Sequence, residues 1–258
     1  MLTPDEVVHG YIGARAAERT FETPYFDDPD DFNGAETLSF NAVGADDMSP
    51  SQRRARLVRW QQAFPLLSAR HLVLAGRSLD QDTFDCALQV RGLETLVVYQ
   101  SRIENIDAIA RASGLLAVRI KSSRPVQGYE PLGRLPRLKS IVLDNPKNLG
   151  SLCFLEHVPQ LEELSILHDA DRSLVLDSLL PLRSLTRLQR LVLGGAFKVR
   201  DGGLSPLHGL PMLENAHIGI YFAEEEFRTL RERTPSLWCG TPFDQGLIAE
   251  FAGGRHPA

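Results

Sequence analysis

The chain has 258 residues, of which 43% are hydrophobic and 24% are charged, proportions that are ordinary for a folded protein. Its formal net charge of -5 argues against the strongly basic face of a nucleic-acid-binding protein. No apolar run reaches the roughly 18 residues of a membrane-spanning helix, and the acidic start is unlike the basic start of a secretory signal. The three cysteines lie far apart. This spacing is typical of reduced thiols, so we expect a cytoplasmic protein.

Two helices and one strand are predicted in the first 68 residues. Residues 3–18 begin with Thr and Pro, which are favourable at a helix start, and then carry an apolar stripe at helical spacing. Residues 35–40 resemble a strand, and a second helix opens at Ser49 and runs through Phe64. We interpret residues 1–68 as a cap that hides the apolar edge of the segment that follows.

Two charged clusters in this cap are candidates for a functional site. The acidic run from Asp27 to Asp31 lacks the alternating Asp spacing, the central Gly and the closing Glu of a calcium loop. We therefore predict a solvated acidic loop. The second helix carries four arginines beside Trp60, a combination that occurs in nucleic-acid binding. Because the chain as a whole is acidic, we interpret them as a solvated helix face; they are Arg53, Arg54, Arg56 and Arg59.

From Ala69 onward the sequence repeats with a period of 22 to 27 residues. Between Leu93 and Leu115, apolar residues occupy places 1, 4, 6, 11, 14 and 17 of the repeat. The alternation at places 4 and 6 predicts a strand, and the three-residue steps after it predict a tight 3₁₀-like return. One such repeat cannot bury its own apolar face, so the repeats must stack. The first places are Ala69, Leu93, Leu115, Leu138, Leu161, Leu188, Leu213 and Leu237.

The pattern changes at both ends of this array. The first return, within residues 80–90, reads as a true helix rather than a 3₁₀ segment. The eighth repeat fails early, because Gly240 and Pro242 stand where apolar strand residues belong. After it we expect a short closing helix over residues 243–251 and a tail. The predicted organisation is therefore an N-terminal cap at 1–68, repeats at 69–236 and a C-terminal cap with tail at 237–258.

The consensus L-x-x-L-x-L is met over residues 69–218, and this array resembles the leucine-rich-repeat family, in its short-repeat, bacterial, internalin-like class. The resemblance implies an α/β solenoid. Its repeats would form a curved stack with a parallel concave β-sheet, an N-terminal helical cap and a short C-terminal cap.

One feature of the family is missing: place 9 holds no Asn. The family's Asn satisfies backbone groups at the turn after each strand. Short polar side chains at place 9 serve the same purpose by local hydrogen bonding; they are Ser101, Ser123 and Asp169. Other repeats lack such a side chain, so we expect irregular turns at Pro146, Ala196 and Tyr221. In the sixth repeat, the glycine pairs at 194–195 and 202–203 are expected to absorb the strain.

In such a stack, the side chains at places 3, 5 and 7 point onto the concave face. They combine apolar residues with interspersed charges, which is typical of a protein-binding surface, although β-branched residues also suit strands wherever they face. Tyr99, Arg119 and Arg190 are the predicted anchors, because Tyr and Arg dominate interface hot spots. The predicted contact residues are Val73, Val97, Tyr99, Arg119, Lys121, Val142, Asp144, Glu163, Leu167, Arg190, Val192 and His217.

We therefore predict a non-enzymatic scaffold that binds a protein partner, with no nucleic acid, membrane, metal or cofactor, and a monomeric state. Three alternatives stay open. The first is an inhibitor or immunity-type protein for a neighbouring toxin or enzyme. The second is an enzyme with a site near His168 and Asp169, although Ser165 and His168 on one strand would stand roughly 10 Å apart. The third is self-association through residues 237–243.

Overall fold

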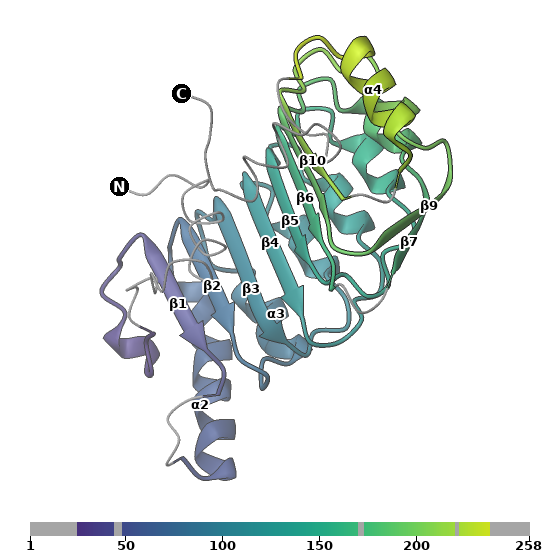
Figure 1. The fold of residues 1–258 in the computed structure, drawn as a ribbon. Coiled ribbons are helices and arrows are strands. Elements are labelled where there is room, and N and C mark those ends of the chain that lie inside the picture. The colour runs from purple at the N-terminus through teal and green to yellow at the C-terminus, as the bar shows by residue number, and fades with distance from the viewer. Residues whose placement is uncertain (1–24, 44–47, 170–172, 220–221, 238–258) are drawn as a thin grey trace, which may run out of the picture. The chain divides into compact units, whose positions relative to one another are not determined.

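The computed structural model describes residues 25–43, 48–169, 173–219 and 222–237. They form two compact units, Met1–Asn148 and Leu149–Ala258, called unit 1 and unit 2 below. Figure 1 shows the strands and helices of both. The predicted helix over 3–18, the closing helix over 243–251 and the tail lie outside the described residues. Within the described ranges, no helix has both the length and the apolar character that are needed to cross a membrane.

Unit 1 contains a parallel sheet with one strand per repeat. Its order follows the chain: β1 (Thr37–Asn41), β2 (His71–Ala75), β3 (Thr95–Ser101), β4 (Ala117–Ser122) and β5 (Ser140–Asp144). The register aligns Leu72 with Leu96, Leu96 with Val118, and Val118 with Ile141. These place-4 side chains are fully buried. The predicted repeat is therefore confirmed at the level of individual residues.

The cap contributes a strand of its own to this sheet. Strand β1 pairs with β2 so that Thr37 faces His71 and Phe40 faces Leu74. The predicted second helix is confirmed as α2 (Pro50–Ala63), which begins with a capping box. In that box Ser49 Oγ accepts from Gln52 N, and Gln52 Oε1 accepts from Ser49 N.

The returns of unit 1 are short, as their three-residue steps predict. They are the 3₁₀ segments η3 (Asp107–Arg111) and η4 (Glu130–Arg134), and two further 3₁₀ turns, η1 (Pro29–Asp31) and η2 (Phe64–Leu66), belong to the cap. The first return is a true helix, α3 (Gln81–Ala87), whose N-cap Asp80 accepts from Thr83 N. Both kinds of return agree with the sequence-based expectation.

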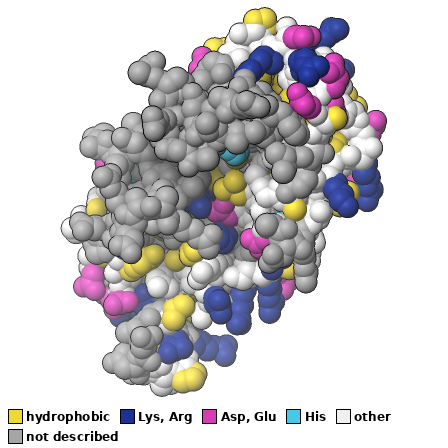
Figure 2. Space-filling model, in the orientation of Figure 1, with side chains coloured by type: hydrophobic (Ala, Val, Ile, Leu, Met, Phe, Trp, Pro, Cys, Tyr) yellow, Lys and Arg dark blue, Asp and Glu magenta, His cyan; other side chains and the backbone are white. Residues whose placement is uncertain are grey.

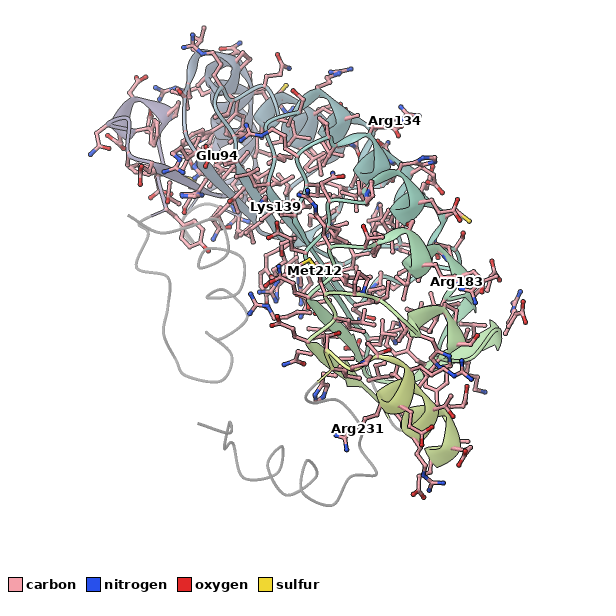
Figure 3. The ribbon with its side chains drawn as sticks, turned by 90° about the horizontal axis from the view of Figure 1, so that it is seen from above. Glu94, Arg134, Lys139, Arg183, Met212 and Arg231 are labelled. Atoms are coloured by element: carbon pink, nitrogen blue, oxygen red, sulfur yellow. The ribbon has the colours of Figure 1, made fainter. Side chains whose placement is uncertain are left out.

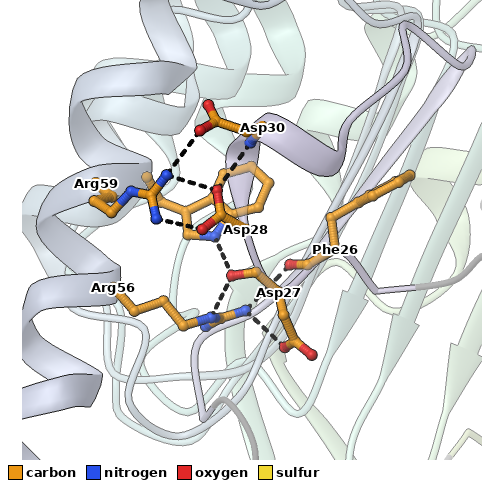
Figure 4. A network of polar contacts seen from close by, with 7 residues as sticks. Phe26, Asp27, Asp28, Asp30, Arg56 and Arg59 are labelled. Atoms are coloured by element: carbon orange, nitrogen blue, oxygen red, sulfur yellow. Dashed lines mark hydrogen bonds and ion pairs between the residues drawn. The ribbon is translucent and has the colours of Figure 1, made fainter.

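The acidic loop and the basic helix of the cap bind each other, and the prediction of a solvated helix face is wrong for Arg56, which is buried, while Arg54 and Arg59 are exposed. Figure 4 shows Arg56 of α2 donating to the backbone carbonyls of Phe26 and Asp27, at 3.1 and 2.7 Å. Arg59 pairs with the carboxylates of Asp28 and Asp30. The Arg56 side chain is only 8% exposed, and burial lowers its pKa against the opposing effect of the nearby aspartates. The loop thus provides partners for Arg56 and Arg59 of the helix.

Unit 2 holds three paired parallel strands in the order β6 (Glu163–Leu167), β8 (Arg190–Gly194) and β10 (Asn215–Ile218). Its returns contain η5 (Cys153–His157), η6 (Leu180–Ser184), η7 (Ser205–Leu207) and the helix α4 (Glu224–Arg233). The place-4 residues Leu164, Leu191 and Ala216 are buried, at 1%, 0% and 0% exposure. The repeat pattern therefore sets the core of unit 2 as it does that of unit 1.

A second, two-stranded sheet in unit 2 was not anticipated. It pairs β7 (Leu174–Ser178) with β9 (Phe197–Asp201) in parallel. The two repeats that supply these strands are the long ones of the array, so the chain has room for a second strand before the 3₁₀ segment. Leu174 and Leu176 are buried while Val175 and Asp177 are exposed. The sequence itself does not show this alternation, because the exposed Val175 is apolar.

The turn after β8 depends on glycine, as predicted for the sixth repeat. Gly195 has a φ of +91°, and a Cβ placed there would lie 1.9 Å from the carbonyl oxygen of His168. His168 N in turn donates to Gly194 O at 2.9 Å. A side chain at position 195 would therefore break the contact between two neighbouring turns.

Candidate binding face on the strands

The strand register brings most of the predicted contact residues of unit 1 into neighbouring rows on one face of the sheet. One row aligns Val73, Val97, Arg119 and Val142, and the next aligns Ala75, Tyr99 and Lys121. We call the side chains at places 3, 5 and 7 the strand face. Strand β1 extends it with Thr37 and Ser39, which the repeat pattern alone did not assign to this face.

A polar cluster lies on the strand face of unit 1. Arg119 Nε on β4 donates to Asp144 Oδ2 on β5 at 2.8 Å, and its Nη2 contacts the same oxygen. Lys121 Nζ lies 5.4 Å from the centre of the Tyr99 ring, in the range of a cation–π interaction. Three neighbouring strands thus hold two cations, one carboxylate and one aromatic ring in fixed positions.

Most of this face in unit 1 is buried, which corrects the expectation of an exposed apolar patch. Val73, Val97 and Val142 are 3%, 0% and 0% exposed, and Arg119 and Asp144 are 5% and 7% exposed. Tyr99 and Lys121 are half-buried. A role of these residues in partner binding stays a prediction.

The strand face of unit 2 is more open. Arg190 on β8 pairs with Glu163 on β6, the residue directly across from it in the register. The Arg190 side chain is 54% exposed and that of Glu163 only 10%. In the adjacent row, Val192 is half-buried and His217 is exposed; Leu167, one row further, is also half-buried. Val192 and His217 thus lie in the row next to an arginine that is paired with a buried carboxylate.

The candidate catalytic residues are not brought together. His168 Nδ1 lies 3.1 Å from the backbone oxygen of Asp169, while Ser165 is buried in β6 at 7% exposure. Both residues lie in the described part of unit 2, and no hydrogen bond joins their side chains there. Among the described residues, no three His, Cys, Asp or Glu side chains are grouped so that they could hold a metal ion. The geometry at His168 therefore lacks the contact between a nucleophile and a base.

No protein-family model matches the chain, and no curated protein matches it in sequence. Among solved structures, the chain is similar to internalin C2 of Listeria monocytogenes, with 18% identity and a TM-score of 0.43 over 64% of this chain and 76% of that one. It is also similar to the internalin InlF of Listeria monocytogenes, with 14% identity and a TM-score of 0.46 over 92% of this chain and 76% of that one.

At such low identities and TM-scores, the leucine-rich-repeat fold is established by the chain's own repeats and strand register rather than by these matches. Unit 1 and unit 2 each stack parallel strands whose place-4 and place-6 residues form the core. The chain is structurally similar to Listeria internalins, which are leucine-rich-repeat proteins.

Proposed function

We propose that the chain is a non-enzymatic binding module that engages a protein partner through its strand face. The observation that carries this proposal is the setting of Arg190, which is 54% exposed and yet paired with the buried Glu163. Arg is enriched among residues that dominate binding energy, and an arginine held in place loses little side-chain entropy on binding. The exposed His217 and the half-buried Val192 border it.

The strands make this surface rigid before any partner arrives. Neighbouring strands are joined by parallel ladders, for example from Glu163–Arg190 to Leu167–Gly194. A preformed surface has little ordering cost, so modest contacts are enough for useful affinity. In unit 1, the half-buried Tyr99 and Lys121 are the accessible members of the predicted set, and they would form a second contact region.

The test compares variants at the accessible anchors with a matched control. Tagged wild-type protein, Arg190→Gln, Tyr99→Ala and the control Arg187→Gln are used to capture partners from the native cell. Arg187 is also an exposed arginine of unit 2, but it lies outside the strands. We expect wild type and control to recover the same partner, and each anchor variant to recover roughly tenfold less, which corresponds to about 1.4 kcal/mol. Equal recovery by all four folded proteins would reject the strand face as the binding surface.

We further propose that the protein is a cytoplasmic monomer. Its described cysteines, Cys86 and Cys153, are both free thiols, which suits a reducing compartment. Light scattering of the purified protein measures the mass in solution directly, and a dimer would favour the alternative of self-association. Detection of the native protein in the fraction outside the cell would contradict the cytoplasmic location.

A further inference from the structure

A row of basic side chains lies where the strands of unit 1 end. It contains one residue from each of four successive repeats, at most three positions beyond the last residue of β2, β3, β4 or β5. All four side chains are exposed, and Figure 2 shows Lys and Arg side chains gathered side by side near the ends of β3 and β4. We call Arg77, Arg102, Arg124 and Lys147 the basic row.

Backbone hydrogen bonds fix the loops that carry this row. Gly76 N donates to Tyr99 O at 3.1 Å, Arg102 N to Leu79 O at 3.0 Å, and Ser123 N to Ser101 O at 2.9 Å. The loops that carry Arg77, Arg102 and Arg124 are thereby tied to a neighbouring repeat, and the backbone positions of the row follow the strand spacing of about 4.8 Å. The row therefore spans on the order of 15 Å.

Little negative charge opposes the row. Within the described residues, the side chains of Arg77 and Arg102 form no hydrogen bond or ion pair. Arg124 contacts Glu104 at 3.4 Å, but both side chains are more than half exposed, so water competes for the pair. Lys147 Nζ donates to a backbone oxygen, that of Ser123, at 3.0 Å. Arg77 and Arg102 thus keep most of their capacity to bind an external anion.

The acidic residues of the same loops are few. Loops 76–80, 102–106, 123–129 and 145–148 contain two carboxylates, Asp80 and Glu104. The Asp80 carboxylate is already engaged, because it accepts from Thr83 N at 2.9 Å as the N-cap of α3. The row therefore carries a local excess of positive charge in a protein whose formal net charge is -5.

We propose that the basic row is a docking surface for an extended, acidic segment of a polypeptide, separate from the strand face. An extended chain rises about 3.3 Å per residue, so four or five residues match the span of the row. Arginine pairs well with carboxylates. The four loops contain a single aromatic residue, Tyr129, and it is buried, with 4% of its surface exposed. The loops therefore offer no platform for stacking bases, which favours an acidic peptide over a single-stranded nucleic acid.

The experiment measures binding of a fluorescein-labelled octaglutamate peptide to the full chain by fluorescence anisotropy, at about 50 mM salt, where screening is weak. The test variant is R77Q/R102Q/R124Q/K147Q. The control, R54Q/R111Q/R134Q/R137Q, removes the same charge from exposed arginines of unit 1 that lie outside the row. Arg134, for example, projects outward from the 3₁₀ segment η4 (Figure 3).

We expect the row variant to bind the peptide at least roughly tenfold more weakly than wild type, and the control to stay within about twofold. The double variant R77Q/R102Q removes only side chains without described contacts and is expected to lose about threefold. Thermal unfolding confirms that each variant is folded. Three results would overturn the proposal: no binding by wild type, equal loss in row variant and control, or tighter binding of an oligothymidylate than of the peptide.

Discussion

Arg119 of β4 and Asp144 of β5 form a buried ion pair across neighbouring strands. Arg119 Nε donates to Asp144 Oδ2 at 2.8 Å, and the two side chains are 6% and 8% exposed. Both residues were predicted as contacts for a partner, and both lie on the strand face. Because they are withdrawn from water, each charge depends on the other for compensation. Their pairing therefore allows both charged residues to lie on a buried face.

Removal of one member of this pair is expected to destabilise unit 1. Asp144→Asn leaves the Arg119 charge buried with weaker compensation, so the free energy of unfolding should fall by about 3 kcal/mol. Asp177→Asn is the control, because its pair with Arg200 is exposed, with side-chain exposures of 58% and 71%; it should cost less than about 1 kcal/mol. Urea denaturation measures both values. A loss as small as the control's would show that Arg119 does not depend on Asp144.

The two arginines of the cap should differ sharply in their contribution to stability. Arg56→Gln removes donors from the carbonyls of Phe26, Asp27 and Asn41 inside the protein, and we expect a loss of about 3 kcal/mol. Arg59→Gln removes an exposed pair with Asp28 and Asp30, and we expect a loss of about 0.5 kcal/mol. Calorimetric melting of the two variants gives the comparison. Similar melting temperatures would contradict the assigned role of Arg56.

Glycine should be required at position 195 and dispensable at position 150. Gly195→Ala places a methyl group 1.9 Å from His168 O at a φ of +91°, so we expect a loss of at least about 2 kcal/mol. A Cβ at Gly150 meets no atom within 4 Å, and Gly150→Ala should change stability by less than about 1 kcal/mol. Denaturation curves of both variants test this. A neutral Gly195→Ala would mean that the turn relaxes freely.

The two described cysteines should differ in reactivity. Cys153 is exposed and Cys86 is half-buried; burial, followed by the neighbouring Asp82, raises the pKa of the Cys86 thiol. Since the thiolate is the reactive form, Cys86 holds less of it at pH 8 than an ordinary cysteine does. In a Cys239→Ser background, iodoacetamide should therefore modify Cys153 several-fold faster, as measured by peptide mass spectrometry. Equal rates at pH 8 would contradict the shielding of Cys86.

Much of the fold was predictable because the apolar core residues of leucine-rich repeats recur at fixed spacings within each repeat. Alternation at places 4 and 6 identified strands such as Thr95–Ser101, and three-residue steps identified returns such as Asp107–Arg111. The first return lacks these three-residue steps, and it is the helix Gln81–Ala87. These features depend on residues within one repeat, so the sequence contains the whole signal.

Other features were decided only by tertiary contacts. Arg56 finds its acceptors 15 to 30 residues away in the chain, and no local pattern distinguishes it from the solvated arginines beside it. The pairing of Arg119 with Asp144 depends on which side chains neighbouring strands bring together. The sequence by itself determined which residues form the repeats and their core, because that information is periodic. Only the tertiary structure decided which charges are paired and which side chains of the strand face are buried, since both depend on contacts between residues that are far apart in the sequence.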